Sequence, residues 1–276
     1  MKKIAFVIIT MGKSGYLENM LDSLKIYENV ILVDNSPEAK CKGLIGKYNF
    51  KYCHELEPGV SSARNAGAKL VGNVDYIYFL DDDLSLGDDW HQELKRILSN
   101  DRDYDLIGGR VKADYFSELY IPEKYLYLVG EKNLGENARV ICKDYVGGCN
   151  LLVKLETYYR LGGFNTNFGH VGTKIGLNED VIFQEQIRKD HGTIYYDPAL
   201  VFFHHWEGKD EDLLMRVKFQ GKYDRQTDWS TNKLRFFLRV FKYTVCVKYL
   251  SIFLKKGRRY NTWYWDCMRY REYIKK

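Results

Sequence analysis

Proline and long apolar runs are scarce in this chain. Only 4 of the 276 residues are proline, which argues against long proline-rich linkers. No uncharged apolar stretch reaches the roughly 20 residues that a membrane-spanning helix needs. The opening MKKIAFVIITMGKSG is basic and then apolar, but its apolar run is short for a secretory signal and no small-residue cleavage site follows. We therefore expect this segment to be a first buried strand.

Cysteine patterns typical of metal sites are also absent from the sequence. The six cysteines include no Cys-x-x-Cys pair, and no histidine spacing suggests a zinc site. Disulfides persist in oxidising compartments, and we find no export signal. We therefore expect reduced thiols and a cytoplasmic protein.

Basic charge is concentrated near the C-terminus. From residue 209 onward, 18 Lys and Arg face 7 Asp and Glu, a net charge of +11. The whole chain carries +5, so residues 1–208 carry −6. An acidic body with a basic tail indicates separate roles for the two parts. We predict a catalytic domain over 1–208 and a basic, aromatic-rich helical region over 209–276.

Apolar runs alternate with helical patterns in the first part of the chain. Continuous apolar runs predict buried strands at 4–10, 30–33, 50–53, 76–80 and 106–111. Apolar or small residues predict helices at 17–24, 61–70 and 90–98. This order predicts an α/β fold, with a parallel sheet and helices on both faces. In such sheets, ligands bind outside the carboxyl ends of the strands.

Three consecutive aspartates, Asp81, Asp82 and Asp83, follow one of these strands. Adjacent carboxylates repel one another unless a cation lies among them. Mg²⁺ or Mn²⁺ would relieve this repulsion and could bridge to a diphosphate. The alternative is a solvated acidic turn that precedes the next helix.

Two other segments of the first half are candidates for ligand binding. Asp34 ends a neighbouring strand in an Asp-Asn-Ser cluster, which by itself favours a turn. Its place on the same sheet edge as the three aspartates favours a ligand site instead. Residues 59–67 open a helix whose N-terminus favours phosphate, and Arg64 could add a charge-assisted contact. Close packing of small residues, with Arg64 on the surface, explains that segment equally well.

Two motifs of the second half add further candidates. Glu179 and Asp180 lie at a predicted helix start after Asn178, which suits an N-cap. Acidic residues are common in first helical turns, but the glycine-containing loop before this helix is unusual for a purely structural one. His204 and His205 follow an apolar strand. Because strand side chains alternate between faces, we expect at most one to face a metal, or else a hydrogen-bonded surface pair.

Taken in order, these segments resemble glycosyltransferase family 2 over about residues 4–205. The resemblance rests on VDNS (33–36), ARNAG (63–67), FLDDD (79–83), GGCN (147–150), LGGF (161–164), ED (179–180) and residues 198–205, which end in HH. It implies a GT-A type, Rossmann-like nucleotide-diphospho-sugar transferase fold, here with a helical basic C-terminal appendage. In place of the Pro and Asn that the family commonly has after the first strand, this chain has TMGKS (10–14).

The resemblance also implies which residues bind the donor nucleotide and the metal. The donor nucleotide would contact Thr10, Asp34, Arg64, Asp81 and Asp82, with Asp34 at the base and Asp81 or Asp82 near the ribose. The Mn²⁺ or Mg²⁺ ligands would be Asp83, Asp81 and His204. The donor would be a sugar linked to UDP, dTDP or GDP.

The same resemblance implies the reaction. Asp180 would be the general base, with Glu179 beside it, and Gly148, Cys149 and Asn150 would shape the donor-sugar and acceptor site. The reaction would be a single in-line displacement that inverts the anomeric centre. The acceptor would be a saccharide or a lipid-linked saccharide, in the synthesis of a cell-surface polysaccharide or glycolipid. A base at a helix start would stay ionised near neutral pH, helped by the helix dipole.

Three other functions are compatible with parts of the sequence. A phosphatase of the haloacid-dehalogenase type would use Asp81 and Asp83 in an Asp-x-Asp-x-Ser motif, but that motif usually follows the first strand. A sugar-nucleotide-binding protein without catalysis is a second alternative, disfavoured by the Glu-Asp pair. The basic tail suggests nucleic-acid binding, but the acidic body disfavours it and we expect no nucleic-acid partner.

The tail contains the most apolar segment of the chain, FFLRVFKYTVCVKYLSIFL (236–254). Arg239, Lys242 and Lys248 interrupt it, and each would be costly inside a bilayer. An amphipathic helix on an anionic membrane surface is one prediction, at the inner face of the cytoplasmic membrane. Trp263 and Trp265 would suit that interface. A helix packed on the protein, with its basic face in solvent, is the alternative.

Overall fold

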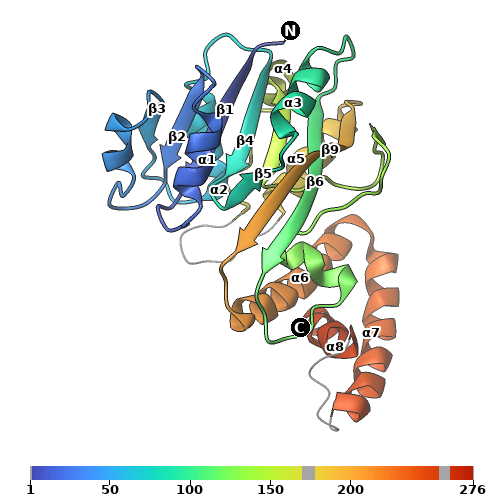
Figure 1. Ribbon diagram of the computed structural model, residues 1–276. Helices are drawn as coiled ribbons and strands as arrows, with labels where there is room; N and C mark the ends of the chain where they lie inside the picture. Colours follow the sequence, from blue (N-terminus) through green and yellow to red (C-terminus); the bar gives the residue numbers. More distant parts are fainter. Residues whose placement is uncertain (1, 170–177, 255–261, 276) are drawn as a thin grey trace. The chain divides into compact units, whose positions relative to one another are not determined.

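The computed structural model describes residues 2–169, 178–254 and 262–275, shown in Figure 1. Their contacts divide the chain into two compact units. The first unit comprises residues 1–114 and 130–205, and the second comprises residues 115–129 and 206–276. The second unit therefore contains a segment from the middle of the sequence as well as the C-terminal region.

The first unit is built on a nine-stranded sheet in the part of the chain that is described. Eight strands follow the order β3-β2-β1-β4-β8-β6-β9-β5, and β7 pairs with β9 beside that path. The strands are β1 (Ile4–Thr10), β2 (Val30–Asp34), β3 (Lys51–His54), β4 (Tyr76–Asp81), β5 (Leu84–Leu86), β6 (Leu106–Tyr115), β7 (Arg139–Val140), β8 (Asn150–Lys154) and β9 (Ile194–Trp206). The five strands expected from apolar runs are all confirmed, with ends that shift by a few residues.

The sheet is mixed, so the prediction of a parallel sheet is right only for its first half. The strands β3, β2, β1 and β4 run parallel. The strand β8 runs antiparallel to both β4 and β6, and β9 runs antiparallel to β5 and β7. Parallel neighbours require a crossover connection, usually a helix. The connections from β1 to β2 and from β3 to β4 contain α-helices, and that from β2 to β3 contains the 3₁₀ segment η1 (Lys42–Gly46). Between β6 and β8, residues 116–149 contain a 3₁₀ segment and the short β7.

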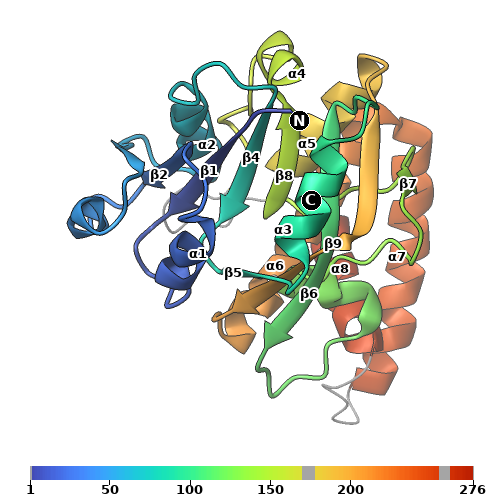
Figure 2. The same ribbon diagram turned by 45° about the horizontal axis from the view of Figure 1, so that its top comes forward.

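Two helical layers cover the first half of the sheet. The helices α1 (Leu17–Leu24) and α3 (Trp90–Leu98) pack with Phe6 and Ile8 on one face. The helices α2 (Val60–Ala68), α4 (Leu155–Arg160) and α5 (Glu179–Lys189) pack with Val7 and Ile9 on the other. Figure 2 shows α1 and α3 on the same side of the sheet. Both faces of β1 are thus buried, which explains its unbroken apolar sequence.

The second unit is a group of helices joined by polar contacts. It contains η2 (Glu123–Val129), α6 (Asp210–Thr231), α7 (Lys233–Leu254) and α8 (Thr262–Ile274). On α6, Asp228 accepts hydrogen bonds from Arg239 of α7 at 2.6 Å and from Tyr273 of α8 at 2.8 Å. Trp265 is fully buried and donates to the carbonyl oxygen of Tyr120 at 3.0 Å. The prediction that Trp265 lies at a membrane interface is therefore wrong, and the side chain of Trp263 lies outside the described residues.

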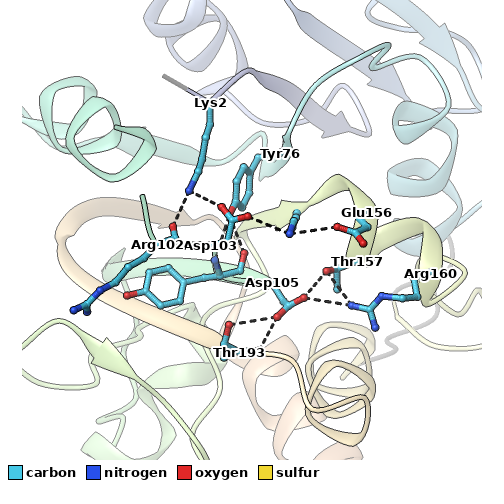
Figure 3. A network of polar contacts seen from close by, with 11 residues as sticks. Lys2, Tyr76, Arg102, Asp103, Asp105, Glu156, Thr157, Arg160 and Thr193 are labelled. Carbon is cyan, nitrogen blue, oxygen red and sulfur yellow. Dashed lines mark hydrogen bonds and ion pairs between the residues drawn. The ribbon is translucent and has the colours of Figure 1, made fainter. Parts of the chain in front are cut away.

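A polar network joins the amino-terminal edge of the sheet to the loops around it, as Figure 3 shows. Asp105 accepts hydrogen bonds from the backbone nitrogen of Thr193 at 2.8 Å and from the Thr157 hydroxyl. Asp103 forms ion pairs with Lys2 at 2.7 Å and Lys154 at 3.2 Å. Burial alone would raise the pKa of Asp105, but the hydrogen bonds from Thr157 and Thr193 hold it below its ordinary value of 3.8.

This network predicts that Asp105 contributes to the free energy of unfolding. The substitution Asp105→Asn should lower the free energy of unfolding by about 1–3 kcal/mol, because it removes charge-assisted hydrogen bonds to Thr157 and Thr193. The pKa of Asp105 is lowered by folding, so its contribution is present above its ordinary pKa and is lost as the pH falls through the folded value. Urea unfolding at pH 7 and below pH 4 checks both points.

The exposed Asp101 provides the matched control for this measurement. Asp101→Asn should leave the urea midpoint unchanged at both pH values. Equal midpoints for the Asp105 variant and its parent would contradict the stabilising role of the network.

Candidate active site

The carboxyl-terminal edge of the first strands gathers most of the predicted site residues. Thr10 at the end of β1 is in register with Asp34 of β2, and Ile9 is in register with Asp81 of β4. Because β8 is antiparallel to β4, the beginning of β8 lies at this same edge, where Asp81 donates its backbone N–H to the carbonyl oxygen of Cys149 at 3.1 Å. The mixed topology therefore brings the GGCN turn beside the three aspartates.

Arg64 of α2 joins this edge to the start of α5. Its guanidinium contacts Asp81 at 3.1 Å and Glu179 at 3.1 Å, and it donates to the carbonyl oxygen of Gly148 at 2.8 Å. The side chain is 1 % exposed and lies over the Phe164 ring. Burial alone would lower the pKa of Arg64, but the carboxylates of Asp81 and Glu179 raise it. The alternative of a surface Arg64 is therefore wrong.

The small residues of α2 explain how Arg64 comes to be buried. A Cβ atom at Gly67 would lie 2.3 Å from a methyl carbon of Val7, so α2 can pack this closely on β1 only with glycine there. Close helix–sheet packing, one of the two interpretations of this segment, is what the structure contains. It brings the N-terminal half of α2, with Arg64, down to the acidic edge.

Asp34 is fully buried and holds the loop that follows β2. It accepts hydrogen bonds from the Ser36 hydroxyl at 2.6 Å, the Cys41 backbone nitrogen at 2.7 Å and the Tyr52 hydroxyl at 3.0 Å. Burial alone would raise the pKa of Asp34, but these bonds hold it below its ordinary value. In this structure Asp34 shapes the loop beside the site, and its contact with a nucleotide base stays a prediction.

Asp82 turns away from Asp83 and towards the end of β1. The Thr10 hydroxyl donates to the Asp82 carboxylate, and the Ser14 hydroxyl donates to the Asp82 carbonyl oxygen at 3.0 Å. Burial, with smaller effects from Asp83 and Asp81, raises the pKa of Asp82 to about 7. The three aspartates thus have three different environments, with Asp81 bound to Arg64, Asp82 to Thr10, and Asp83 facing β9.

Asp83 lies opposite His204, with 3.4 Å between a carboxylate oxygen and the imidazole Nε2. The pairing of β5 with β9 produces this approach, since Leu84 is in register with His204. Within residues 2–169, 178–254 and 262–275, no group of three or more acidic, His or Cys side chains forms a complete metal cage. A carboxylate and an imidazole fit an ion that takes its remaining ligands from a diphosphate and water, as Mg²⁺ usually does.

His205 has other partners than His204, and the role of His204 as a metal ligand stays a prediction. The Nδ1 of His205 lies 2.9 Å from Asp114 and its Nε2 lies 2.6 Å from the Ser85 hydroxyl. The Tyr16 ring stacks on the imidazole at 3.7 Å between centroids. These contacts connect β5, β6 and β9 behind His204. Tyr16 and Asp114 have no sequence signal for this role, and Ser85 was noted only as part of the Asp-x-Asp-x-Ser motif, because only the tertiary structure brings these residues to one histidine.

Asp180 lies in the first turn of α5, next to the GGCN turn. Asn178 occupies the N-cap position with φ of 74° and makes no side-chain capping bond, so its expected capping role is not observed. A Cβ atom at Gly148 would lie 2.7 Å from a carboxylate oxygen of Asp180, so glycine permits this approach. Burial, followed by repulsion from Glu179, raises the pKa of Asp180 to about 7. This differs from the expectation that the helix dipole keeps Asp180 ionised.

The other two residues of the GGCN turn are buried. Cys149 is 8 % exposed, and burial raises the pKa of its thiol well above the ordinary value. Asn150 is fully buried and accepts a hydrogen bond from the backbone nitrogen of Gly109 at 3.0 Å. The burial of both side chains holds the GGCN turn, which contains Gly148, in place. Their contact with sugar substrates stays a prediction.

Comparison with known proteins shows the family of the chain. The family model described as "Glycosyl transferase family 2" matches residues 5–154, which is more than half of the chain. The chain belongs to glycosyl transferase family 2. It is a glycosyltransferase, so the phosphatase alternative is set aside. The matched region contains the three aspartates, Arg64 and the GGCN turn, whereas α5 and His204 lie beyond it.

Two curated relatives are also glycosyltransferases by name. A glucosyl-dolichyl phosphate glucuronosyltransferase of Haloferax volcanii is 29% identical over 255 residues, which cover 81% of this chain and 80% of that protein. An uncharacterized glycosyltransferase of Acanthamoeba polyphaga mimivirus is 26% identical over 159 residues, covering 54% of this chain and 57% of that one.

A solved structure confirms the fold class of this glycosyltransferase. The crystal structure of GalNAc-T7 with UDP, GalNAc and Mn²⁺ matches with a TM-score of 0.54 at 14% identity. The match covers 75% of this chain and 44% of GalNAc-T7, so the chain spans less than half of that protein's length. At this identity the likeness concerns the fold alone. The predicted GT-A type α/β fold is thereby confirmed.

The contact between Gly148 and Asp180 leads to a prediction for this glycosyltransferase. Gly148→Ala should displace the Asp180 carboxylate and lower the rate of sugar transfer by about tenfold to a hundredfold, since misplacement of about 1 Å can have that effect. Gly43→Ala is the control, because nothing lies within 4 Å of a Cβ atom there. Transfer rates and circular dichroism would be measured for both variants. Normal transfer by the Gly148 variant would mean that Asp180 does not act from this position.

Proposed function

We propose that this glycosyltransferase inverts the anomeric centre of a nucleoside-diphosphate sugar as it transfers the sugar to a hydroxyl of a saccharide or lipid-linked saccharide. The proposal rests chiefly on one observation. Asp83 and His204 lie at the same sheet edge as Arg64, which contacts both Asp81 and Glu179, the residue next to Asp180. One buried cation therefore links Asp81, which is two residues before Asp83, to Glu179, which precedes Asp180.

The residues of this edge have distinct tasks in the proposed reaction. Asp83 and His204 would hold Mn²⁺ or Mg²⁺ together with the diphosphate of a UDP, GDP or dTDP sugar. The bound ion would neutralise charge on the diphosphate. Arg64 fixes Asp81 on the donor side and Glu179 on the acceptor side. Thr10 anchors Asp82, and Asp34 holds the loop that would border the base.

Asp180 is the proposed general base. Its carboxylate accepts the proton of the acceptor hydroxyl while that oxygen forms a bond to the anomeric carbon. The bond from that carbon to the diphosphate oxygen breaks, and the nucleoside diphosphate leaves with the electron pair. Attack on the face opposite the leaving group inverts the anomeric configuration. Glu179 cannot exchange this task easily, because its carboxylate is bound by Arg64.

The role of Asp180 predicts both a mutational and a pH effect. Asp180→Asn should lower transfer by about 10²- to 10⁴-fold, the usual contribution of general base catalysis, and leave donor binding intact. Glu179, Arg64 and Lys132 are the charged groups that act on the pKa of Asp180, which is raised to about 7. A base works deprotonated, so the parent rate should rise as the pH increases through about 7. Initial rates from pH 5 to about 9 at saturating donor check this.

The exposed Asp101 also supplies the control for the base. Asp101→Asn should keep the parental rate and pH profile. A fast Asp180→Asn enzyme with the same pH profile as its parent would place the base elsewhere.

Metal dependence is a second prediction. Nucleoside diphosphate with Mn²⁺ at about 100 times its Kd should stabilise the parent by about 2.7 kcal/mol. Asp83→Asn should remove the part of this stabilisation that depends on Mn²⁺, and His204→Ala should reduce it more than His205→Ala does. Thermal unfolding with UDP, GDP and dTDP, with Mn²⁺ or EDTA, measures these effects. The exposed Asp88 gives the control Asp88→Asn, and full sugar transfer in EDTA would contradict the assignment.

The surface of α7 supports a place at the membrane. Apolar side chains that are between 53 % and 73 % exposed line one side of this helix: Leu234, Phe237, Leu238, Phe241, Val245 and Tyr249. The basic residues of α7 include Lys233, Arg235, Lys242 and Lys248, and the helix contains no Asp or Glu. Among the described helices, none is long and apolar enough to cross a bilayer. An apolar stripe flanked by cations suits the interface of an anionic membrane.

We therefore propose that the protein works at the inner face of the cytoplasmic membrane, on an acceptor carried by a lipid. The name of the Haloferax volcanii relative, which includes a dolichyl phosphate, agrees with such an acceptor. Lys242 and Lys248 are exposed, as expected for a basic face in solvent, whereas Arg239 pairs with Asp228. The apolar side chains of the stripe are exposed as well.

The membrane proposal predicts vesicle binding through α7. The full chain should co-sediment with phosphatidylcholine vesicles that contain phosphatidylglycerol, and less with pure phosphatidylcholine. The double variant with Phe237→Ser and Phe241→Ser should bind at least about tenfold more weakly, since each ring buries apolar area in the interface. Leu56→Ser removes an equally exposed apolar residue of the first unit and should bind normally. Parent protein that stays in the supernatant at low salt would contradict the proposal.

A further inference from the structure

Lys132 lies between the candidate metal edge and the proposed base. Its backbone exchanges two hydrogen bonds of 2.8 Å with Val111, which fix this segment against β6. Two residues earlier, a Cβ atom at Gly130 would lie 2.5 Å from the His204 imidazole. On its other side, a Cβ atom at Gly147 would lie 3.6 Å from the Cβ atom of Lys132. The segment 130–132 therefore runs from His204 to the turn that contacts Asp180.

The ammonium group of Lys132 differs from the other cations of this region. Arg64 pairs with Asp81 and Glu179, and Arg110 pairs with Glu136 at 2.7 Å. Within the described part of the chain, Lys132 makes no side-chain hydrogen bond or ion pair. It is half-buried, and burial lowers its pKa against the opposite effects of Asp180 and Asp144. A desolvated cation without a direct partner is costly unless a ligand supplies the anion.

The surroundings restrict what that ligand can be. Glycine at 147 and 148 lets the GGCN turn lie close to Lys132 on one side and to the Asp180 carboxylate on the other. In the proposed reaction the acceptor hydroxyl and the donor sugar bind beside this turn. An ammonium offers three donors and no acceptor, so an oxygen group of a sugar substrate is a suitable partner, and an anionic one offsets the cost of burying the cation.

We propose that Lys132 binds an anionic oxygen group of a sugar substrate beside Asp180, and so selects charged over neutral substrates. Two substrates could carry this group. One is a hexuronic acid donor with its C6 carboxylate, and the other is an acceptor sugar whose anomeric oxygen bears a phosphate. The inference rests on the proposed function, because it needs the donor and acceptor to bind at this edge.

The donor test compares a matched pair of nucleotide sugars. The first step identifies which of UDP, GDP and dTDP binds the parent with Mn²⁺ by calorimetry. Binding of the corresponding glucose and glucuronic acid nucleotides is then measured for the parent, Lys132→Gln, Lys132→Arg and Lys143→Gln. Lys143 is an exposed lysine of the following segment and serves as the control. Lys132→Gln should lose about tenfold to a hundredfold in affinity for the glucuronic acid nucleotide only, as for a hydrogen bond to a charged group.

The acceptor test uses a second matched pair, decyl phosphate-linked glucose and decyl glucoside. If the anion belongs to the acceptor, Lys132→Gln should raise the KM of the phosphate-linked glucose by a similar factor and leave that of the glucoside unchanged. Lys132→Arg should retain the preference in whichever pair shows it. Circular dichroism and binding of the nucleoside diphosphate alone confirm that each variant is folded.

The outcomes are distinct. Loss of the preference for the charged member of either pair supports the inference and identifies its source. Equal effects of Lys132→Gln on charged and neutral members of both pairs, or no effect on any, would overturn it. If the parent itself binds none of the three nucleoside diphosphates, the proposed function fails before any variant is measured, and this inference fails with it.

Discussion

The buried guanidinium of Arg64 is the interaction on which the arrangement of the site depends. A guanidinium stays charged in proteins, so its burial is tolerated only with anionic partners. Asp81 comes from the end of β4 and Glu179 from the start of α5, two elements that no regular backbone pairing joins. Because Arg64 forms ion pairs with both Asp81 and Glu179, it holds the start of α5 near the end of β4. The carbonyl oxygen of Gly148 completes its contacts and adds the GGCN turn to the same unit.

One cation does not neutralise all the acids at this edge. Arg64 pairs with Asp81 and Glu179, while Asp83 lies opposite His204 and Asp82 accepts from the Thr10 hydroxyl. Burial is the largest cause that raises the pKa of Asp82 and of Asp180 to about 7, and repulsion from neighbouring carboxylates adds to it. A divalent ion beside Asp83, and an acceptor proton taken up by Asp180, are the two changes that would relieve this repulsion. The acidic clustering and the proposed chemistry thus have the same physical origin.

The mixed direction of the strands brings the acidic residues, the GGCN turn and His204 to one edge of the sheet. Parallel strands place the ends of β1, β2 and β4 together, whereas the antiparallel β8 contributes its beginning. The pairing of β5 with β9 then brings His204 to Asp83. A fully parallel sheet would send the GGCN turn to the opposite edge. The change of direction in the second half is therefore what allows residues about 120 apart in sequence, such as Asp83 and His204, to form one site.

The sequence by itself determined the strands and helices of the first half, and the order of the motifs in family 2. Those features are local, because an apolar run or a helical repeat is decided by near neighbours. It also determined that acidic residues follow the strands, and hence the edge where the site lies. It did not determine the direction of β8, since residues 116–149 have weak periodicity.

Only the tertiary structure decided which polar groups meet. Arg64 could be on the surface or in the site from its sequence context, and it is buried because Gly67 lets α2 approach β1. His204 and His205 are adjacent in sequence, yet pairing with β5 brings the first to Asp83, while Ser85 and Asp114 hold the second. On α7, Arg239 pairs with Asp228 of another helix, whereas Lys242 and Lys248 stay exposed. These contacts join residues that are far apart in the sequence, so they cannot be predicted from the periodicity of each segment.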